Sequence, residues 1–130
     1  MTKTVITFGT FDVLHIGHLS ILERASELGD RLLVGVSTDE LNILKKGRSP
    51  IYPQEQRLAL VGALRCVDAT FLEHSLEQKA EYIRQHAADV LVMGDDWRGK
   101  FDVFRDICEV VYLTRTPAIS TTATIEMIRR

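Results

Sequence analysis

The sequence predicts an α/β fold, a Rossmann-like doubly wound parallel sheet of about five strands with helices on both faces. Segments typical of strands alternate with segments typical of helices, which favours parallel strands joined by helical crossovers. The run 31–37 is apolar at consecutive positions, as a strand buried on both faces of a sheet is. The 130 residues contain no repeat and no low-complexity stretch, so we expect one domain over residues 1–130.

The first half of the chain is expected to supply two strands and three helices. A β-branched and aromatic run that ends at Gly9 predicts a strand, and Gly29 can end the helix that follows it. Pro53 can begin a later helix, after a polar loop over 45–53 that Gly47 and Pro50 interrupt. The expected elements of this half are the strands 4–9 and 31–37 and the helices 17–28, 39–44 and 53–65.

The second half continues the alternation. Its short β-branched runs predict strands, and Thr121 can cap a closing helix. The expected elements are the strands 68–72, 90–94 and 109–113 and the helices 77–86, 101–107 and 121–129. Ligands of open parallel sheets bind beyond the carboxyl ends of the strands, so we expect the site in the segments 9–18, 37–48, 94–100 and 114–122.

Charge and cysteine content set limits on partners and location. The net charge is −2 at pH 7, so we expect neither a nucleic-acid nor a membrane surface, and any anion site must come from local placement of His, Lys and Arg. Cys66 and Cys108 are far apart in apolar surroundings, which predicts buried thiols in a reducing compartment. We find no signal peptide or spanning segment and expect a cytoplasmic protein.

Two histidines stand three residues apart directly after the first expected strand, in the motif His15-Ile16-Gly17-His18. At the start of a helix this spacing makes the two imidazoles neighbours, and Gly17 lets a ligand approach the backbone. The helix N-terminus adds N–H groups and the positive end of a dipole. Imidazoles placed there can donate hydrogen bonds to phosphate oxygens in a transition state. We therefore predict a triphosphate pocket; histidines that only cap or pack are the alternative.

A second motif follows the last expected strand and opens the last helix. It reads Arg115-Thr116-Pro117-Ala118-Ile119-Ser120-Thr121-Thr122. A hydroxyl there can simply cap the helix. An arginine, several hydroxyls and a helix N-terminus can also form a second anion site. The two roles are compatible, since one hydroxyl can cap while others face a ligand.

With both motifs, the sequence resembles the cytidylyltransferase branch of the HxGH nucleotidyltransferases, and within it the glycerol-3-phosphate cytidylyltransferases. Matching stretches extend over nearly the whole chain: Gly9-Thr10-Phe11-Asp12, Leu22-Glu23-Arg24-Ala25, Ser37-Thr38-Asp39-Glu40, Arg65-Cys66-Val67-Asp68 and Val92-Met93-Gly94-Asp95-Asp96-Trp97. The resemblance implies a single nucleotidyltransferase domain that transfers CMP from CTP to sn-glycerol 3-phosphate, giving CDP-glycerol and pyrophosphate. It also implies Mg²⁺ bound mainly through the triphosphate, a homodimer, and a role in teichoic-acid or capsule synthesis.

The resemblance also implies individual roles. The catalytic residues would be His15, His18, Lys45 and Arg115. CTP would contact Thr10, Phe11, His15, Ile16, Gly17, His18, Lys46, Arg65, Asp96, Arg115, Thr116, Ile119, Ser120, Thr121 and Thr122. The acceptor would contact Asp12, Asp39, Lys45 and Lys79, and Arg57 is a weaker candidate. Plainer alternatives are open: surface lysines at 45 and 79, an ion pair of Arg65 with Asp68, and capping by Asp39 or Asp96.

One departure from the family pattern falls where the acceptor should bind. The family often has a second lysine two residues after the first, and here Gly47 stands there, between Lys46 and Arg48. The acceptor alcohol is therefore open. Competing hypotheses are adenylyl transfer, as in FAD synthase-like enzymes, transfer to another phosphorylated alcohol, and a non-catalytic nucleotide sensor. A nicotinamide-binding domain would need GxGxxG after the first strand, and residues 9–18 do not supply it.

Overall fold

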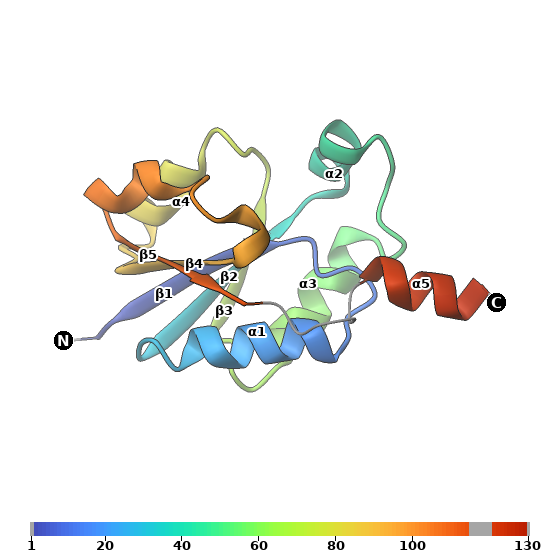
Figure 1. The fold of residues 1–130 in the computed structure, drawn as a ribbon, viewed down its shortest axis with the longest axis horizontal. Coiled ribbons are helices and arrows are strands. Elements are labelled where there is room, and N and C mark those ends of the chain that lie inside the picture. Colours follow the sequence, from blue (N-terminus) through green and yellow to red (C-terminus); the bar gives the residue numbers. More distant parts are fainter. Residues whose placement is uncertain (1, 115–120, 130) are drawn as a thin grey trace.

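The computed structural model describes residues 2–114 and 121–129, which form a five-stranded parallel sheet with helices on both faces (Figure 1). The strand order is β3-β2-β1-β4-β5. The strands are β1 (Thr4–Gly9), β2 (Arg31–Ser37), β3 (Ala69–Glu73), β4 (Val90–Gly94) and β5 (Glu109–Leu113). The predicted fold class is confirmed. Four strands have the predicted bounds, and β3 is shifted by one residue.

The helices follow the expected order: three are shorter than predicted, one is longer, and the last has the predicted bounds. They are α1 (Ile16–Ser26), α2 (Asp39–Lys46), α3 (Gln54–Gly62), α4 (Lys79–Gln85) and α5 (Thr121–Arg129). The helix predicted over 101–107 is present as a 3₁₀ helix, η2 (Asp102–Asp106), which is shorter by one residue at each end. A second 3₁₀ turn, η1 (Asp95–Trp97), was not predicted.

Alternate side chains of the strands face two separate cores, as the pleat requires. On one face, Val5 packs with Leu22 of α1 and Val61 of α3. On the other, Ile6 packs with Ile83 of α4, and Phe104 of η2 packs against the same cluster. Figure 1 shows the sheet between these two helical layers, with α4 on one side and α1 and α3 on the other. Burial of both faces explains the consecutive apolar residues in the strands.

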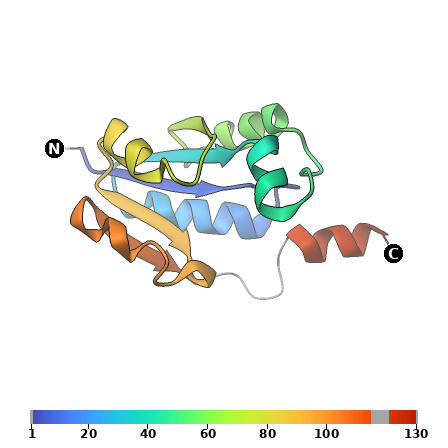
Figure 2. The same ribbon diagram turned by 90° about the horizontal axis from the view of Figure 1, so that it is seen from above.

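The topology creates a crevice at the middle of the sheet. The chain runs from β1 to β2 on one side, and β4 pairs with β1 on the other. Ligands of open α/β sheets bind at such a switch point, outside the carboxyl ends of the strands. At this end, α5 extends away from the sheet, and the two chain ends lie on opposite sides of the molecule (Figures 1 and 2). Within the described ranges, no helix is both long and apolar enough to cross a bilayer.

The end of α2 differs from the prediction. The helix extends two residues past its predicted end at 44 and stops at Gly47, which has φ 74°. Residues other than glycine rarely adopt this left-handed backbone conformation. Lys45 and Lys46 therefore lie on the last helical turn rather than in a loop, and the backbone accounts for a glycine at 47.

The two cysteines are half-buried free thiols on opposite faces of the sheet. Burial raises the pKa of both the Cys66 and the Cys108 thiols. Each packs at the edge of one core, less deeply than the sequence predicts.

Candidate active site

A cavity of about 720 Å³ lies at the carboxyl ends of β1 and β4, within the size range of small-molecule sites. Its walls come from the turn between β1 and α1, the end of α2, the loop over 48–51, the η1–η2 region and α5. Among the predicted site residues, those that line it are Thr10, Phe11, Asp12, His18, Lys45, Lys46, Lys79, Asp96, Thr121 and Thr122. The topology thus brings together most of the described candidates.

The two motif histidines cap α1 reciprocally. His15 is the N-cap residue, and its Nδ1 accepts the Gly17 N–H at 3.0 Å. His18 Nδ1 accepts the His15 N–H at 3.2 Å, which completes a capping box. Because each Nδ1 is an acceptor, the proton of each neutral ring lies on Nε2. Capping, the plain alternative, therefore fixes the tautomer that a phosphate donor needs.

The two Nε2 atoms converge on the first residue of α5. Thr121 Oγ1 lies 3.4 Å from His15 Nε2 and 3.3 Å from His18 Nε2. The same hydroxyl donates to the Asp12 carbonyl oxygen at 2.9 Å, so its lone pairs are available to both imidazoles. His18 lines the cavity, and His15 reaches the same point through this hydroxyl. Two N–H donors and a helix N-terminus thus meet at one position.

The turn that carries the motif has an unusual backbone. Phe11 has φ 53° and Val13 has φ 46°, which for a β-branched residue is an outlier. The Phe11 ring packs edge to face against the His18 ring, with centroids 5.6 Å apart. Strained conformations of this kind persist where the surroundings hold them, often at functional sites. Here they turn the chain sharply from β1 into α1.

Asp12 joins this turn to the loop over 48–53. Its carboxylate accepts the N–H groups of Ile51 at 2.7 Å and Tyr52 at 2.8 Å, and that of Val13 at 3.1 Å. The sequence resemblance implies that Asp12 contacts the acceptor. Although Asp12 lines the cavity, its carboxylate oxygens are engaged by backbone, and the structure gives it a positioning role.

Arg57 is the buried centre of a second network, and its side chain is fully inaccessible. Its Nη1 donates to the Ser37 carbonyl at 2.7 Å and the Thr10 carbonyl at 2.9 Å, and its Nε to the Tyr52 carbonyl at 2.9 Å. Its Nη2 pairs with the Asp39 carboxylate at 2.7 Å. One guanidinium therefore ties the ends of β1 and β2 to α2 and the 48–53 loop.

Asp39 is not brought into the cavity. Its carboxylate pairs with Arg57 and accepts the Gln54 N–H at 3.2 Å, while its own N–H donates to the Gln54 side chain at 2.9 Å. The acceptor contact that the resemblance implies for Asp39 does not fit this position. The carboxylate instead neutralises Arg57, which a buried guanidinium requires.

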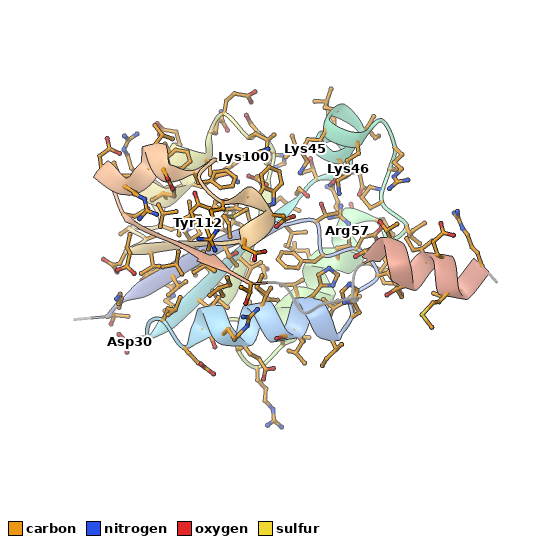
Figure 3. All side chains as sticks on the ribbon, viewed as in Figure 1. Asp30, Lys45, Lys46, Arg57, Lys100 and Tyr112 are labelled. Atoms are coloured by element: carbon orange, nitrogen blue, oxygen red, sulfur yellow. The ribbon has the colours of Figure 1, made fainter. Side chains whose placement is uncertain are left out.

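Positive charge gathers along the cavity although the whole chain is slightly acidic. Lys45 and Lys46 come from α2, and Lys100 comes from the segment after η1 (Figure 3). Lys46 Nζ donates to Thr10 Oγ1 at 3.5 Å. Partial burial lowers the pKa of both the Lys45 and Lys46 ammonium groups, while Glu73 opposes that shift at Lys45. Partly desolvated cations attract anions more strongly than fully hydrated ones.

Several predicted residues lie elsewhere. Ile16 is exposed, and the Gly17 N–H is engaged in the cap. Arg65 is exposed before the start of β3, at the opposite end of the sheet from the cavity, and within one chain it does not join the site. Four further predicted site residues fall outside the described ranges: Arg115, Thr116, Ile119 and Ser120.

The structure adds two residues that sequence reasoning missed. Asn42 is buried on α2, donates to Ser37 Oγ at 2.9 Å and accepts from Thr10 Oγ1 at 2.9 Å. The position of this single amide among Leu41, Ile43 and Leu44 was the sequence signal for a buried, hydrogen-bonded side chain. Glu73 is buried at the carboxyl end of β3 and also lines the cavity. The strand-end rule would have found it, had it been applied to that strand.

Comparison with known proteins agrees with this geometry. The cytidylyltransferase-like family model matches residues 6–127. The chain is 52% identical to the glycerol-3-phosphate cytidylyltransferase of Bacillus subtilis (strain 168) over 126 residues, 97% of each chain. It is 48% identical to that of Staphylococcus aureus (strain NCTC 8325 / PS 47), over 92% of this chain and 90% of the relative.

A solved structure is also similar. It is that of a lipopolysaccharide core biosynthesis protein from Thermoplasma volcanium GSS1, with a TM-score of 0.79 and 27% identity. The match covers 89% of this chain and 99% of that one. The fold, the histidine pair beside the cavity, the family model and the extent of these matches point the same way: the chain belongs to the cytidylyltransferase-like family.

Proposed function

We propose that this protein transfers CMP from CTP to sn-glycerol 3-phosphate, giving CDP-glycerol and pyrophosphate. The observation that carries the proposal is the convergence of His15 Nε2 and His18 Nε2 on one hydroxyl at the N-terminus of α5. Two donors directed at one point, beside a cavity lined by Lys45 and Lys46, suit the charge of a triphosphate.

The reaction needs positioning more than acid–base chemistry. A phosphate monoester is mostly dianionic at pH 7, since its second pKa is about 6. An acceptor oxygen can therefore attack the α-phosphorus in line without losing a proton. The new bond joins that oxygen to the α-phosphorus, and the bond from the α-phosphorus to the bridging oxygen breaks, releasing pyrophosphate.

The tautomer of the histidines fits this chemistry. With Nδ1 held by the backbone, each ring presents Nε2–H as a donor, so His15 and His18 act as stabilisers of developing charge rather than as bases. The N-termini of α1 and α5 add dipoles of the same sign. Lys45 and Lys46 would hold the incoming anions against their mutual repulsion.

Magnesium fits the residues at hand. Mg²⁺ in nucleotide sites commonly binds through one or two carboxylates together with substrate phosphates. Asp96 lines the cavity beyond the carboxyl end of β4, and we infer that it supports an ion carried by the triphosphate. When bound, that ion would neutralise charge on the leaving pyrophosphate.

Support for CTP and glycerol 3-phosphate comes from the relatives with that printed activity and from the motif Arg115 to Thr122. The first six residues of that motif lie outside the described ranges, so a catalytic role for Arg115 stays a prediction. Homodimerisation, a single domain and a cytoplasmic location likewise stay predictions.

Pyrophosphate release tests the proposal. The protein would be given CTP or ATP with glycerol 3-phosphate, FMN or phosphopantetheine, in the presence of Mg²⁺. We expect release with CTP and glycerol 3-phosphate. Turnover with ATP and FMN, without turnover of CTP, would favour an adenylyltransferase. Tight CTP binding without turnover of any acceptor would favour a nucleotide sensor.

A further inference from the structure

Arg24 joins α1, the helix that begins at the histidine motif, to the end of β5. Its Nη2 donates to the Thr114 carbonyl oxygen, and its Nη1 lies 3.4 Å from Thr114 Oγ1; Figure 1 shows the end of β5 beside α1. Thr114 follows the last residue of β5 and directly precedes the motif Arg115 to Thr122. The resemblance places Arg24 in a matching stretch but implies no role for it, and the transfer chemistry does not use it.

The stretch from Thr114 to Thr121 is held at both ends by the same part of the fold. At its far end, Thr121 Oγ1 donates to the Asp12 carbonyl at 2.9 Å and lies 3.3 Å from His18 Nε2. At its near end, Thr114 is held by Arg24, six residues after His18 on α1. At a rise of 1.5 Å per residue, His18 and Arg24 are about 9 Å apart along the helix axis. The helix α1 therefore fixes both ends of the stretch relative to the histidines.

Apolar packing already attaches β5 to the same helix. Val111 and Leu113 of β5 pack against the core cluster that contains Leu22 and Ala25 of α1. The strand is thus held in place before its last bonds to Arg24 are counted. We infer that the guanidinium sets the exact position of the strand end rather than attaching the strand.

The guanidinium suits positioning better than stabilisation. Its Nε is buried and, in the described ranges, has no hydrogen-bond partner, which is unfavourable for a buried N–H. Arg24 is half-buried and Thr114 is exposed, and substitutions near the surface usually change the free energy of unfolding little. A guanidinium that donates through two nitrogens nevertheless adds geometric specificity to the contact.

We propose that Arg24 is a positioning residue for CTP, which places the start of the motif Arg115 to Thr122 so that this motif and the two histidines act on one triphosphate. The assignment rests on the proposed function, in which the motif contacts CTP. Arg24 does not line the cavity, so its effect on CTP passes through Thr114. Lys45, which the resemblance assigns to the acceptor, lies on a different helix, and acceptor binding should change little.

Calorimetric titration with CTP and Mg²⁺ tests the assignment, because no transfer can occur without acceptor. In Arg24→Gln we expect Kd for CTP to rise by about tenfold or more, the effect of losing hydrogen bonds from a charged group. KM for glycerol 3-phosphate at saturating CTP and the melting temperature should stay close to those of the unaltered protein. Arg24→Lys keeps the charge but not the two-nitrogen fork, so most of the loss of CTP affinity should remain.

Arg84→Gln is the matched control, because Arg84 is an exposed arginine of α4 that pairs with Glu81 at 3.5 Å and lies outside the cavity lining. Its Kd for CTP should equal that of the unaltered protein. An unchanged Kd in Arg24→Gln would overturn the assignment. A lower melting temperature with CTP and acceptor weakened equally would show a merely structural contact and overturn it as well. If the unaltered protein did not bind CTP, the proposed function would be refuted, and the assignment with it.

Discussion

The imidazole of His18 stacks on that of His15, with ring centroids 3.9 Å apart, while each Nδ1 accepts a backbone N–H of α1. Each ring therefore caps the helix through Nδ1 on one edge and presents Nε2–H to phosphate on the other. The spacing of the motif follows from this: Nδ1 of the fourth residue must reach the N–H of the first, as in other capping boxes.

Replacing either histidine by alanine should remove both the cap and the phosphate donor, whereas His15→Asn should remove the donor alone. We expect His15→Ala and His18→Ala each to lower kcat by about 100-fold or more, the loss typical of a transition-state donor. His15→Asn retains a good N-cap acceptor but no Nε2 donor, so it should unfold near the temperature of the unaltered protein and still lose kcat. His74→Ala, at an exposed position, is the control. Normal kcat in His15→Asn would refute the donor role.

Loss of the Arg57 guanidinium should destabilise the protein severely. Arg57→Ala leaves the Asp39 carboxylate without its cation and removes one donor from each of three carbonyls, so we expect the free energy of unfolding to fall by about 3–5 kcal/mol. Urea denaturation measures this. Arg57→Lys keeps the charge but cannot reproduce the fork, and most of the loss should remain. A loss within the range of ordinary surface substitutions, about 0.5 kcal/mol, would contradict the network.

The Asp12 carboxylate should hold the 48–53 loop closed. In Asp12→Asn one oxygen becomes an N–H donor that faces backbone donors, so we expect amide hydrogen exchange at Ile51 and Tyr52 to accelerate by about tenfold or more. KM for the acceptor should rise as well. Asp30→Asn is the control, because the Asp30 carboxylate bonds the Lys3 N–H far from the cavity. Exchange rates in Asp12→Asn equal to those of the unaltered protein would show that the Asp12 carboxylate does not hold this loop.

As the pH is raised, acceptor binding should weaken at a lower pH than it would if Lys45 were fully exposed. Partial burial lowers the pKa of Lys45 below the ordinary value of about 10.4. As the pH rises through that lowered pKa, the ammonium loses its proton and its attraction for phosphate, so KM for the acceptor rises. In Lys45→Arg the guanidinium stays charged, and the alkaline limb should move to higher pH. An unmoved limb would show that another group titrates.

The sequence predicts the sheet well because each strand carries its own signal. The bounds of β2, β4 and β5 follow from short β-branched runs, and the histidine motif is local to one turn. Positions that depend on tertiary contacts were harder. The sequence makes Arg57 only a weak acceptor-binding candidate, since its partners at the ends of β1 and β2 meet it only after folding. The family resemblance implies that Asp39 contacts the acceptor, and sequence spacing gives no sign of its pairing with Arg57.

We propose above all that this cavity transfers a cytidylyl group to glycerol 3-phosphate. The most direct measurement is ³¹P NMR of one mixture that contains the protein, Mg²⁺, glycerol 3-phosphate and equal CTP and ATP. We predict the two coupled diphosphate resonances of CDP-glycerol and free pyrophosphate, with ATP unconsumed. ADP-glycerol in their place, or an unchanged spectrum with a folded protein, would contradict the claim.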